Sequence, residues 1–237
     1  FFQAEDGIRD RSPSRGLGDV YKRQLLCLSP LLVPIVITLR LTGEGEVFFL
    51  QERIGKGGEK FKLFKFATML KDSPNLGTGT VTMKEDPRVL PVGKFLRKTK
   101  INELPQLLNI LFGDMSIIGP RPLTIQTFSS YSNQTQDAIK SIKPGLSGIG
   151  SIVFRGEEEM MHGVNASVDF YENTIAPYKG ALEEWFVANR NLYIYFMSII
   201  LTIWAVLFPK TKSVWICFKD IPIPPEELKK LLNYDNK

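Results

Sequence analysis

Two uncharged apolar runs stand near the ends of the chain, at residues 25–39 and 191–208, and a polar region rich in glycine separates them. Each run is shorter than the roughly 20 residues that a helix needs to cross a bilayer. In the first run Ser29-Pro30 and Pro34 each remove a backbone hydrogen bond, so any helix there should be kinked. A straight membrane span that has lost its first turn remains the alternative for the first run, and a complete span the alternative for the second.

The region between the two runs predicts one β-hairpin and several helices. Residues 47–69, VFFLQERIGKGGEKFKLFKFATM, hold two short aromatic-rich runs around Gly57-Gly58, a pattern typical of a hairpin. Gly145 and Gly148 lie in an extended segment and should allow close backbone approach. The segments that have helical character are 123–142, 157–186 and 221–232. Together these elements predict an α+β fold that is predominantly helical.

A third pattern, from Arg88 to Pro122, predicts a helix that begins at an anion site. Asn102 is suited to capping this helix, Glu103 falls in its first turn, and the helix then runs toward Phe112. Its buried face is marked by apolar residues at helical spacing: Ile101, Leu104, Leu108 and Leu111. Cationic residues surround its start: Arg97, Lys98, Lys100 and Arg121. Free N–H groups and guanidinium groups together favour the binding of phosphate.

The same stretch resembles the bacterial sugar transferase family, the monotopic phosphoglycosyl transferases. Residues 96–122, LRKTKINELPQLLNILFGDMSIIGPRP, match a family signature in which LRK, an Asp-Glu pair, LPQL, GDMS and GPRP follow one another. The resemblance continues upstream through residues 47–69 and downstream through KPGLSGIG, and it covers most of residues 25–207. So many motifs in the family's order make the resemblance specific.

The resemblance implies an enzyme that transfers a sugar-1-phosphate from a UDP-sugar to polyprenyl phosphate, using Mg²⁺. Such a reaction is the first membrane step of exopolysaccharide, O-antigen or glycan biosynthesis, at the cytoplasmic face of the bacterial inner membrane. The implied fold has a re-entrant membrane helix that breaks at Ser29-Pro30, a small hairpin, a compact cytoplasmic catalytic domain and an interfacial helix at residues 191–208. A homo-oligomer and downstream glycosyltransferases are further implied partners.

The resemblance also implies roles for individual residues. It assigns phosphate binding to Arg97, Arg121 and Lys65, and it assigns Mg²⁺ binding to Glu103. Asn102 stands where the family has its nucleophilic Asp, and a neutral amide is a poor nucleophile. Three alternatives follow: direct transfer between donor and acceptor, attack by another acid such as Glu103 or Asp114, or a silenced relative that only binds substrate or partner enzymes.

Charge is distributed unevenly along the chain. The net charge is +5, but the segment from Arg53 to Lys100 holds 12 Lys and Arg against 4 acids. This basic block should face lipid headgroups and a nucleotide diphosphate, or else solvent. Phenylalanines interleave with it, as in proteins that bind single-stranded nucleic acid, but no nucleic-acid-binding motif occurs, so we expect no such partner. Acids 157–159 are expected to form a solvated face.

The predicted organisation has four parts. Residues 1–24 lack apolar periodicity and resemble a translated sequencing adapter, so we expect an artefact or a disordered tail and a missing natural N-terminus. Residues 25–43 form the membrane segment, residues 44–210 form the sugar transferase domain, and residues 211–237 form a C-terminal tail. The cysteines Cys27 and Cys217 are too far apart in sequence to suggest a disulfide framework or metal site.

Overall fold

The computed structural model describes residues 26, 29–42, 44–76, 86–160, 168–208 and 213–234. It shows a mostly helical α+β fold, as the sequence predicts. A helix over residues 29–41 comes first. The strands and helices that follow are β1 (Phe48–Ile54), β2 (Lys60–Phe66), α2 (Pro91–Lys98), α3 (Gln106–Phe112), β3 (Ser116–Ile118), α4 (Ile125–Ser129), α5 (Asn133–Lys140), β4 (Gly145–Ser147), α6 (Ile149–Val153), α7 (Glu157–Met160), α8 (Val168–Phe170), α9 (Ala176–Asn189), α10 (Leu192–Leu207), α11 (Ser213–Cys217) and α12 (Glu226–Lys229).

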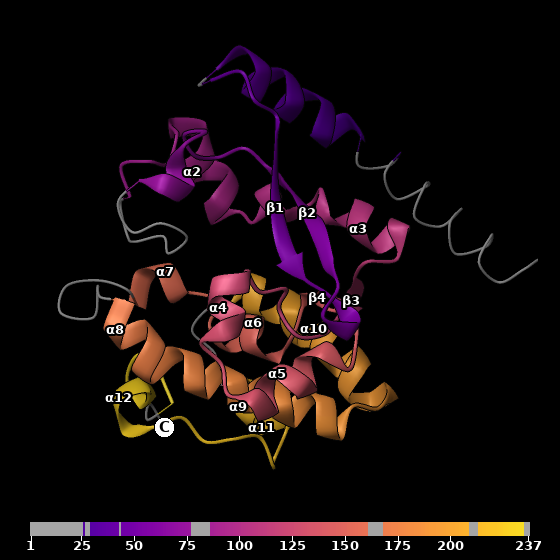
Figure 1. The fold of residues 1–237 in the computed structure, drawn as a ribbon, viewed down its shortest axis with the longest axis vertical. Helices are drawn as coiled ribbons and strands as arrows, with labels where there is room; N and C mark the ends of the chain where they lie inside the picture. Colours follow the sequence, from indigo (N-terminus) through magenta and orange to yellow (C-terminus); the bar gives the residue numbers. More distant parts are fainter. Residues whose placement is uncertain are drawn as a thin grey trace, which may run out of the picture.

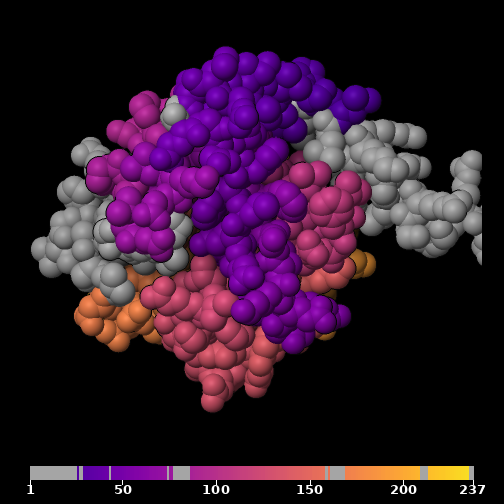
Figure 2. Space-filling view, turned by 45° about the horizontal axis from the view of Figure 1, so that its top comes forward, coloured from indigo at the N-terminus to yellow at the C-terminus, as the bar shows by residue number. Residues whose placement is uncertain are grey.

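The β1–β2 hairpin joins the two levels of the molecule (Figure 1). Helix 29–41 and α2 lie at one end, α4 to α12 lie at the other, and the antiparallel strands run between them. Phe48 pairs with Phe66 and Ile54 with Lys60, so the turn falls at Gly57-Gly58 as predicted. With the end that carries helix 29–41 tilted toward the viewer, the helix and the hairpin form one continuous surface across the molecule (Figure 2).

Helix 29–41 packs along one side only. Leu39 is buried against Phe66 of β2 and Leu96 of α2. Its outer face is apolar and exposed at Leu31, Val33, Ile37 and Leu41. The helix continues through Pro34, whose carbonyl accepts a hydrogen bond from the Thr38 hydroxyl at 2.8 Å. Ser29 and Pro30 lie at the start of this helix, and residues 27 and 28, which precede the predicted break, lie outside the described part. None of the described helices has both the length and the apolar character needed to cross a membrane.

Helix α10 occupies the second apolar run and also packs along one side. Its N-cap is Asn191, whose Oδ1 accepts from the backbone N–H of Ile194 at 2.8 Å. The inward face, with Ile194, Ser198, Leu201 and Ala205, is buried in the largest apolar cluster, which α6, α9 and α11 share. The outward face is exposed and apolar at Tyr193, Phe196, Ile200, Ile203 and Leu207. The spacing of both sets follows the 3.6-residue helical period.

Strands β3 and β4 form a short parallel pair that the sequence did not predict, with Ser116 opposite Gly145 and Ile118 opposite Ser147. The predicted close approach at Gly145 and Gly148 is confirmed. A Cβ atom on Gly145 would lie 2.1 Å from the Gly119 nitrogen, and a Cβ on Gly148 would lie 2.1 Å from the Gly119 carbonyl oxygen. The pair therefore holds the residues after Gly119 at a fixed distance from the PGLSGIG segment.

The prediction that Asn102 caps a helix is wrong. Residues Ile101–Glu103 form a 3₁₀ turn that begins after Lys100, which adopts a left-handed conformation with φ of 61°. The α-helix begins at Gln106, with Pro105 at its N-cap position. The turn places Asn102 inward, where its residue surface is 7% exposed and its side chain makes no capping hydrogen bond.

Candidate active site

A cavity of about 510 Å³ lies between the two levels of the fold. Its walls come from β1 and β2, from α2 with the 3₁₀ turn after it, from the loop that follows β3, and from α6, α7 and α9. The structure brings every residue assigned to the site from the sequence to this cavity: Lys65, Arg97, Asn102, Glu103 and Arg121.

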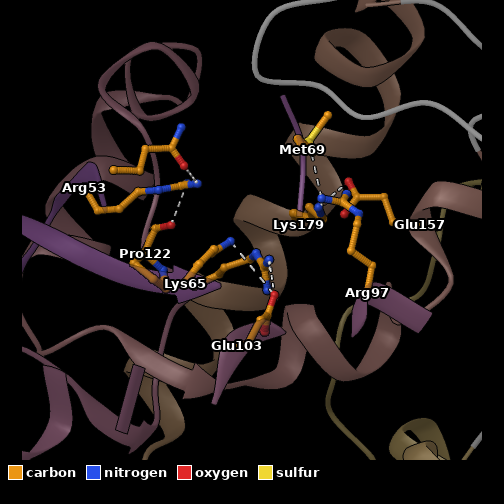
Figure 3. A network of polar contacts seen from close by, with 10 residues as sticks. Arg53, Lys65, Met69, Arg97, Glu103, Pro122, Glu157 and Lys179 are labelled. Atoms are coloured by element: carbon orange, nitrogen blue, oxygen red, sulfur yellow. Dashed lines mark hydrogen bonds and ion pairs between the residues drawn. The ribbon is translucent and has the colours of Figure 1, made fainter. Parts of the chain in front are cut away.

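Glu103 stands at the centre of a cationic cluster in the cavity wall. Its Oε1 accepts a hydrogen bond from Nη2 of Arg121 at 3.3 Å and lies 4.0 Å from Nζ of Lys65. Lys65 and Glu103 point toward one another in Figure 3. Burial alone would raise the pKa of Glu103, but Arg121 and Lys65 lower it to about 2. Glu103 is therefore a carboxylate at neutral pH, available to a cation.

The cations of this cluster exceed what Glu103 can compensate. Burial, with a smaller contribution from the nearby arginines 53, 121 and 97, lowers the pKa of Lys65 to about 7, although Glu103 opposes this shift. Burial, followed by Arg121, lowers the pKa of Arg53 to about 10. Like charges at close range favour the binding of an anion among them.

Arg53 also braces the segment Pro120-Arg121-Pro122 through its backbone, a role that sequence analysis missed. Its Nη1 donates to the carbonyl oxygen of Pro122 at 3.0 Å, and its Nη2 donates to Oε1 of Gln51 at 2.5 Å (Figure 3). Arg53 thus holds the Pro-Arg-Pro segment from the hairpin side. Its only signal in the sequence is membership of the basic block, in which nothing distinguishes it from the exposed lysines.

A second charged cluster lines another part of the cavity. Nζ of Lys179 on α9 lies 2.5 Å from Oε1 of Glu157 on α7, and it stands 5.1 Å and 5.3 Å from the ring centres of Phe154 and Tyr171. Nη1 of Arg97 contacts the sulfur of Met69 at 3.6 Å. The expectation that Glu157 belongs to a solvated face is wrong, because the carboxylate turns inward to pair with Lys179 (Figure 3).

Glu183, one turn beyond Lys179 on α9, is a further acid in the cavity wall. Its Oε1 accepts from the backbone N–H of Arg121 at 3.5 Å. Burial raises the pKa of Glu183 to about 7, against the opposing effects of this hydrogen bond, Lys179 and Arg121. Sequence analysis missed Glu183 because it lies in a stretch, ALEEWF, that shows only a helical pattern.

Asn102 and Glu103 are the candidate ligands for Mg²⁺. Oδ1 of Asn102 is buried and has no hydrogen-bond partner in the described part of the chain. An amide oxygen beside an ionised carboxylate fits Mg²⁺, which binds one or two protein oxygens and completes its shell with water and substrate phosphates. Clusters of three or more His, Cys, Asp or Glu are absent from the described residues, so any such ion would depend on the substrate for ligands.

Asp114 is not placed as a nucleophile. It follows α3, and its Oδ2 accepts from Nδ2 of Asn109 at 3.2 Å. It is not among the residues that line the cavity. Of the two acids proposed from the sequence to replace the missing Asp, only Glu103 is at the site.

Comparison with known proteins shows the family of the chain. The model of the family described as bacterial sugar transferase matches residues 20–209. The chain belongs to the bacterial sugar transferase family. Among curated relatives, it is 34% identical to UDP-glucose:undecaprenyl-phosphate glucose-1-phosphate transferase of Klebsiella pneumoniae, over 67% of this chain and 37% of the relative. It is 38% identical to the Escherichia coli (strain K12) protein of the same name, over 62% of this chain and 32% of the relative.

A shorter relative aligns over most of its length. The exopolysaccharide production protein ExoY of Sinorhizobium fredii is 31% identical to this sugar transferase, over 67% of this chain and 80% of the relative. The chain thus spans about a third of the two glucose-1-phosphate transferases and most of ExoY. The family model covers all the cavity residues from β1 to α9.

Proposed function

We propose that this sugar transferase moves a sugar-1-phosphate from a UDP-sugar to polyprenyl phosphate and releases UMP. The observation that carries the proposal is the surplus of partly buried cations around one ionised glutamate, Glu103, in a cavity large enough for a nucleotide. Two relatives are named for transfer of glucose-1-phosphate to undecaprenyl phosphate, which supports the same substrate classes here. Phosphoryl transfer depends mainly on positioning and on neutralising charge.

The cations would hold the donor diphosphate. Arg121 lies between two prolines and its segment is braced by Arg53 through Pro122, so its backbone has little freedom, and Glu103 holds its guanidinium. Lys65 and Arg97 approach the same cavity from β2 and α2. Charge-assisted hydrogen bonds from such preorganised donors strengthen as negative charge develops on the transferring phosphoryl group.

Mg²⁺ would be held by Glu103, with Oδ1 of Asn102 as a second oxygen ligand. When bound, the ion neutralises phosphate charge and aligns the attacking and leaving oxygens. Asn102 itself would orient phosphate groups, because an amide does not attack phosphorus.

Direct transfer is the route we propose for this chain. An anionic oxygen of polyprenyl phosphate attacks the phosphorus that carries the sugar, and the bond from that phosphorus to the oxygen of UMP breaks. The electron pair leaves on UMP, and no proton needs to move because the attacking oxygen is already ionised. Arg121, Lys65 and Arg97 would stabilise the charge on the entering and leaving groups.

The lipid acceptor would reach the cavity from the end that carries helix 29–41. Phe48 and Leu50 of β1 are exposed apolar residues that also line the cavity, and β1 begins beside that helix (Figure 1). The exposed apolar faces of helix 29–41 and α10 suit the cytoplasmic face of a bacterial inner membrane. Here an apolar chain could stay in lipid while its phosphate enters the cationic cluster.

A silenced relative that binds the same ligands is the second candidate function, and Asn102 is the observation that favours it. The test is UMP release from a panel of UDP-sugars with polyprenyl phosphate, by the wild type, Asn102→Asp and Glu103→Gln. We expect wild-type turnover without a phosphosugar adduct in mass spectrometry, and loss of more than tenfold in Glu103→Gln.

The control is Asn133→Asp, which makes the same chemical change at an exposed position on α5 and should behave as the wild type. If only Asn102→Asp turns over and carries the adduct, the natural chain is a binding protein and the enzymatic proposal fails.

A further inference from the structure

Glu183 is a buried carboxylate with an unused oxygen in the cavity wall. The residue is 4% exposed. Its Oε1 has one long contact, the 3.5 Å hydrogen bond from the backbone N–H of Arg121, and its Oε2 is buried without a hydrogen-bond partner in the part of the chain that the structure describes. A buried carboxylate that is left unpaired opposes folding strongly, so this oxygen is expected to have a partner in the working protein.

The neighbouring cations do not supply that partner. The guanidinium of Arg121 donates to Glu103, and the ammonium of Lys179 pairs with Glu157. Glu183 feels both cations at longer range but forms no ion pair with either. Two acids of the cavity are thus matched with cations, whereas Glu183 is left with free acceptor capacity.

The fold also clears space for this carboxylate. Gly150 on α6 faces Glu183, and a Cβ atom there would lie 2.6 Å from Oε1 and 3.4 Å from Cδ. Any other residue at position 150 would push the carboxyl group aside. The absence of a side chain at Gly150 thus keeps the carboxylate in place at the cavity wall.

Arg121 contacts both Glu183 and the proposed phosphate-binding cluster. Its backbone N–H contacts Glu183 while its guanidinium contacts Glu103, so the two acids are separated by about the reach of one arginine side chain. Because Glu183 lines the same cavity, a ring attached to a phosphate held by that guanidinium could lie within reach of its carboxylate. The rings of a sugar nucleotide present hydroxyl groups, which are donors for an unpaired carboxylate oxygen.

We propose that Oε2 of Glu183 accepts hydrogen bonds from hydroxyl groups of the ring next to the phosphate that Arg121 holds, and so selects for a sugar nucleotide. This assignment rests on the proposed function. The shared chemistry is a ring hydroxyl, which comes either from the transferred sugar or from the ribose of the nucleotide.

The test is calorimetric binding by the full chain in detergent, with UMP and with the tightest-bound of UDP-glucose, UDP-galactose and UDP-N-acetylgalactosamine. In Glu183→Gln the amide oxygen is expected to stay in the position of Oε1, where it accepts from the backbone N–H of Arg121. The amide NH₂ group then occupies the position of Oε2, so a hydrogen-bond donor replaces the acceptor there. We expect affinity for the UDP-sugar to fall at least tenfold. Unchanged affinity for UMP would identify the sugar as the source of the hydroxyl, and an equal loss for UMP would identify the ribose.

The matched control is Glu184→Gln on the next residue, whose carboxylate accepts from Gln134 and Thr135 and is not part of the cavity wall; it should bind like the wild type. Gly150→Ala keeps the charge but displaces the carboxylate, and should weaken binding in the same direction even if Glu183→Gln fails to fold. Wild-type affinity in both cavity variants would overturn the assignment. Failure of the wild-type chain to bind any of these nucleotides would instead contradict the proposed function.

Discussion

Single charged residues in the cavity wall differ in how far their burial is compensated. Glu103 has a guanidinium and an ammonium beside it, and Lys179 has a carboxylate and two aromatic rings. Glu183 has one long backbone contact. A buried charge without a partner lowers the stability of the fold. Functional sites often contain such a charge because a bound ligand supplies the missing hydrogen bonds.

The stability of the protein should therefore depend on the protonation of Glu183. Its folded-state pKa is about 7 and its ordinary value is 4.5, so between these values the folded state binds more protons and stability falls as pH rises. Above about pH 7 the full cost of burial, about 3 kcal/mol by linkage, is present, and below 4.5 it is absent. Glu183→Gln should be more stable than the wild type at pH 8, with the difference shrinking toward pH 5.

Denaturant unfolding of the wild type and Glu183→Gln at these two pH values checks this prediction, with Glu184→Gln as the control for loss of a carboxylate on the same helix. A Glu183→Gln difference that is constant with pH, or one of opposite sign at pH 8, would contradict it.

At the scale of elements, short segments place the site residues, and glycines set their spacing. Strands β3 and β4 have three residues each, yet the contact of Gly119 with Gly145 and Gly148 fixes where the following Pro-Arg-Pro segment begins. Gly148 has an extended backbone that any residue could adopt, so its requirement is purely one of space.

Gly148→Ala should displace β4 from β3 and with it Arg121. A Cβ atom would meet the Gly119 carbonyl oxygen at 2.1 Å, and backbone cannot move aside as a flexible side chain can. We expect a loss of about 3 kcal/mol in stability, at the upper end for overpacking, and a loss of UDP-sugar binding measured by calorimetry. Gly57→Ala, with φ of 73° but open space around it, is the control and should lose about 1 kcal/mol while binding normally.

Some helices and strands could be predicted from local sequence patterns, and others could not. The hairpin was predictable because aromatic residues and the glycine pair mark it locally, and α10 was predictable because its run is long and uncharged. The β3–β4 pair was not, since three residues carry no periodicity. Asn102 has the sequence of a cap, but the left-handed turn at Lys100 and the tight turn after it depend on packing that no local pattern encodes.

The residues of the candidate site, too, could be predicted only where a local sequence motif marks them. Lys65, Arg97, Asn102, Glu103 and Arg121 were found through motifs of the family, and the fold brings them to one cavity. Arg53, Lys179 and Glu183 were missed because they come from a strand and a helix distant in sequence, and only the folded chain brings them to the cavity. The motifs account for the phosphate cluster, whereas the opposite wall required the structure.

The whole molecule carries two exposed apolar faces, on helix 29–41 and on α10, and exposed apolar faces of this kind mark contacts with a membrane or a partner. On α10 the charge-free outer face should lie in the membrane interface, where burying each half-exposed Ile contributes about 1 kcal/mol. Ile200→Glu combined with Ile203→Glu should therefore lower binding to liposomes at least tenfold, because two apolar contacts are lost and two charges must stay in water. Both positions are more than half exposed, so thermal unfolding should change little.

Flotation with liposomes that contain anionic lipid measures the effect, and Ser129→Glu with Ser130→Glu adds the same charge at exposed polar positions as the control. If the α10 variant floats as well as the wild type while the fold is intact, α10 is not a membrane contact, and its apolar face must be covered by something other than lipid.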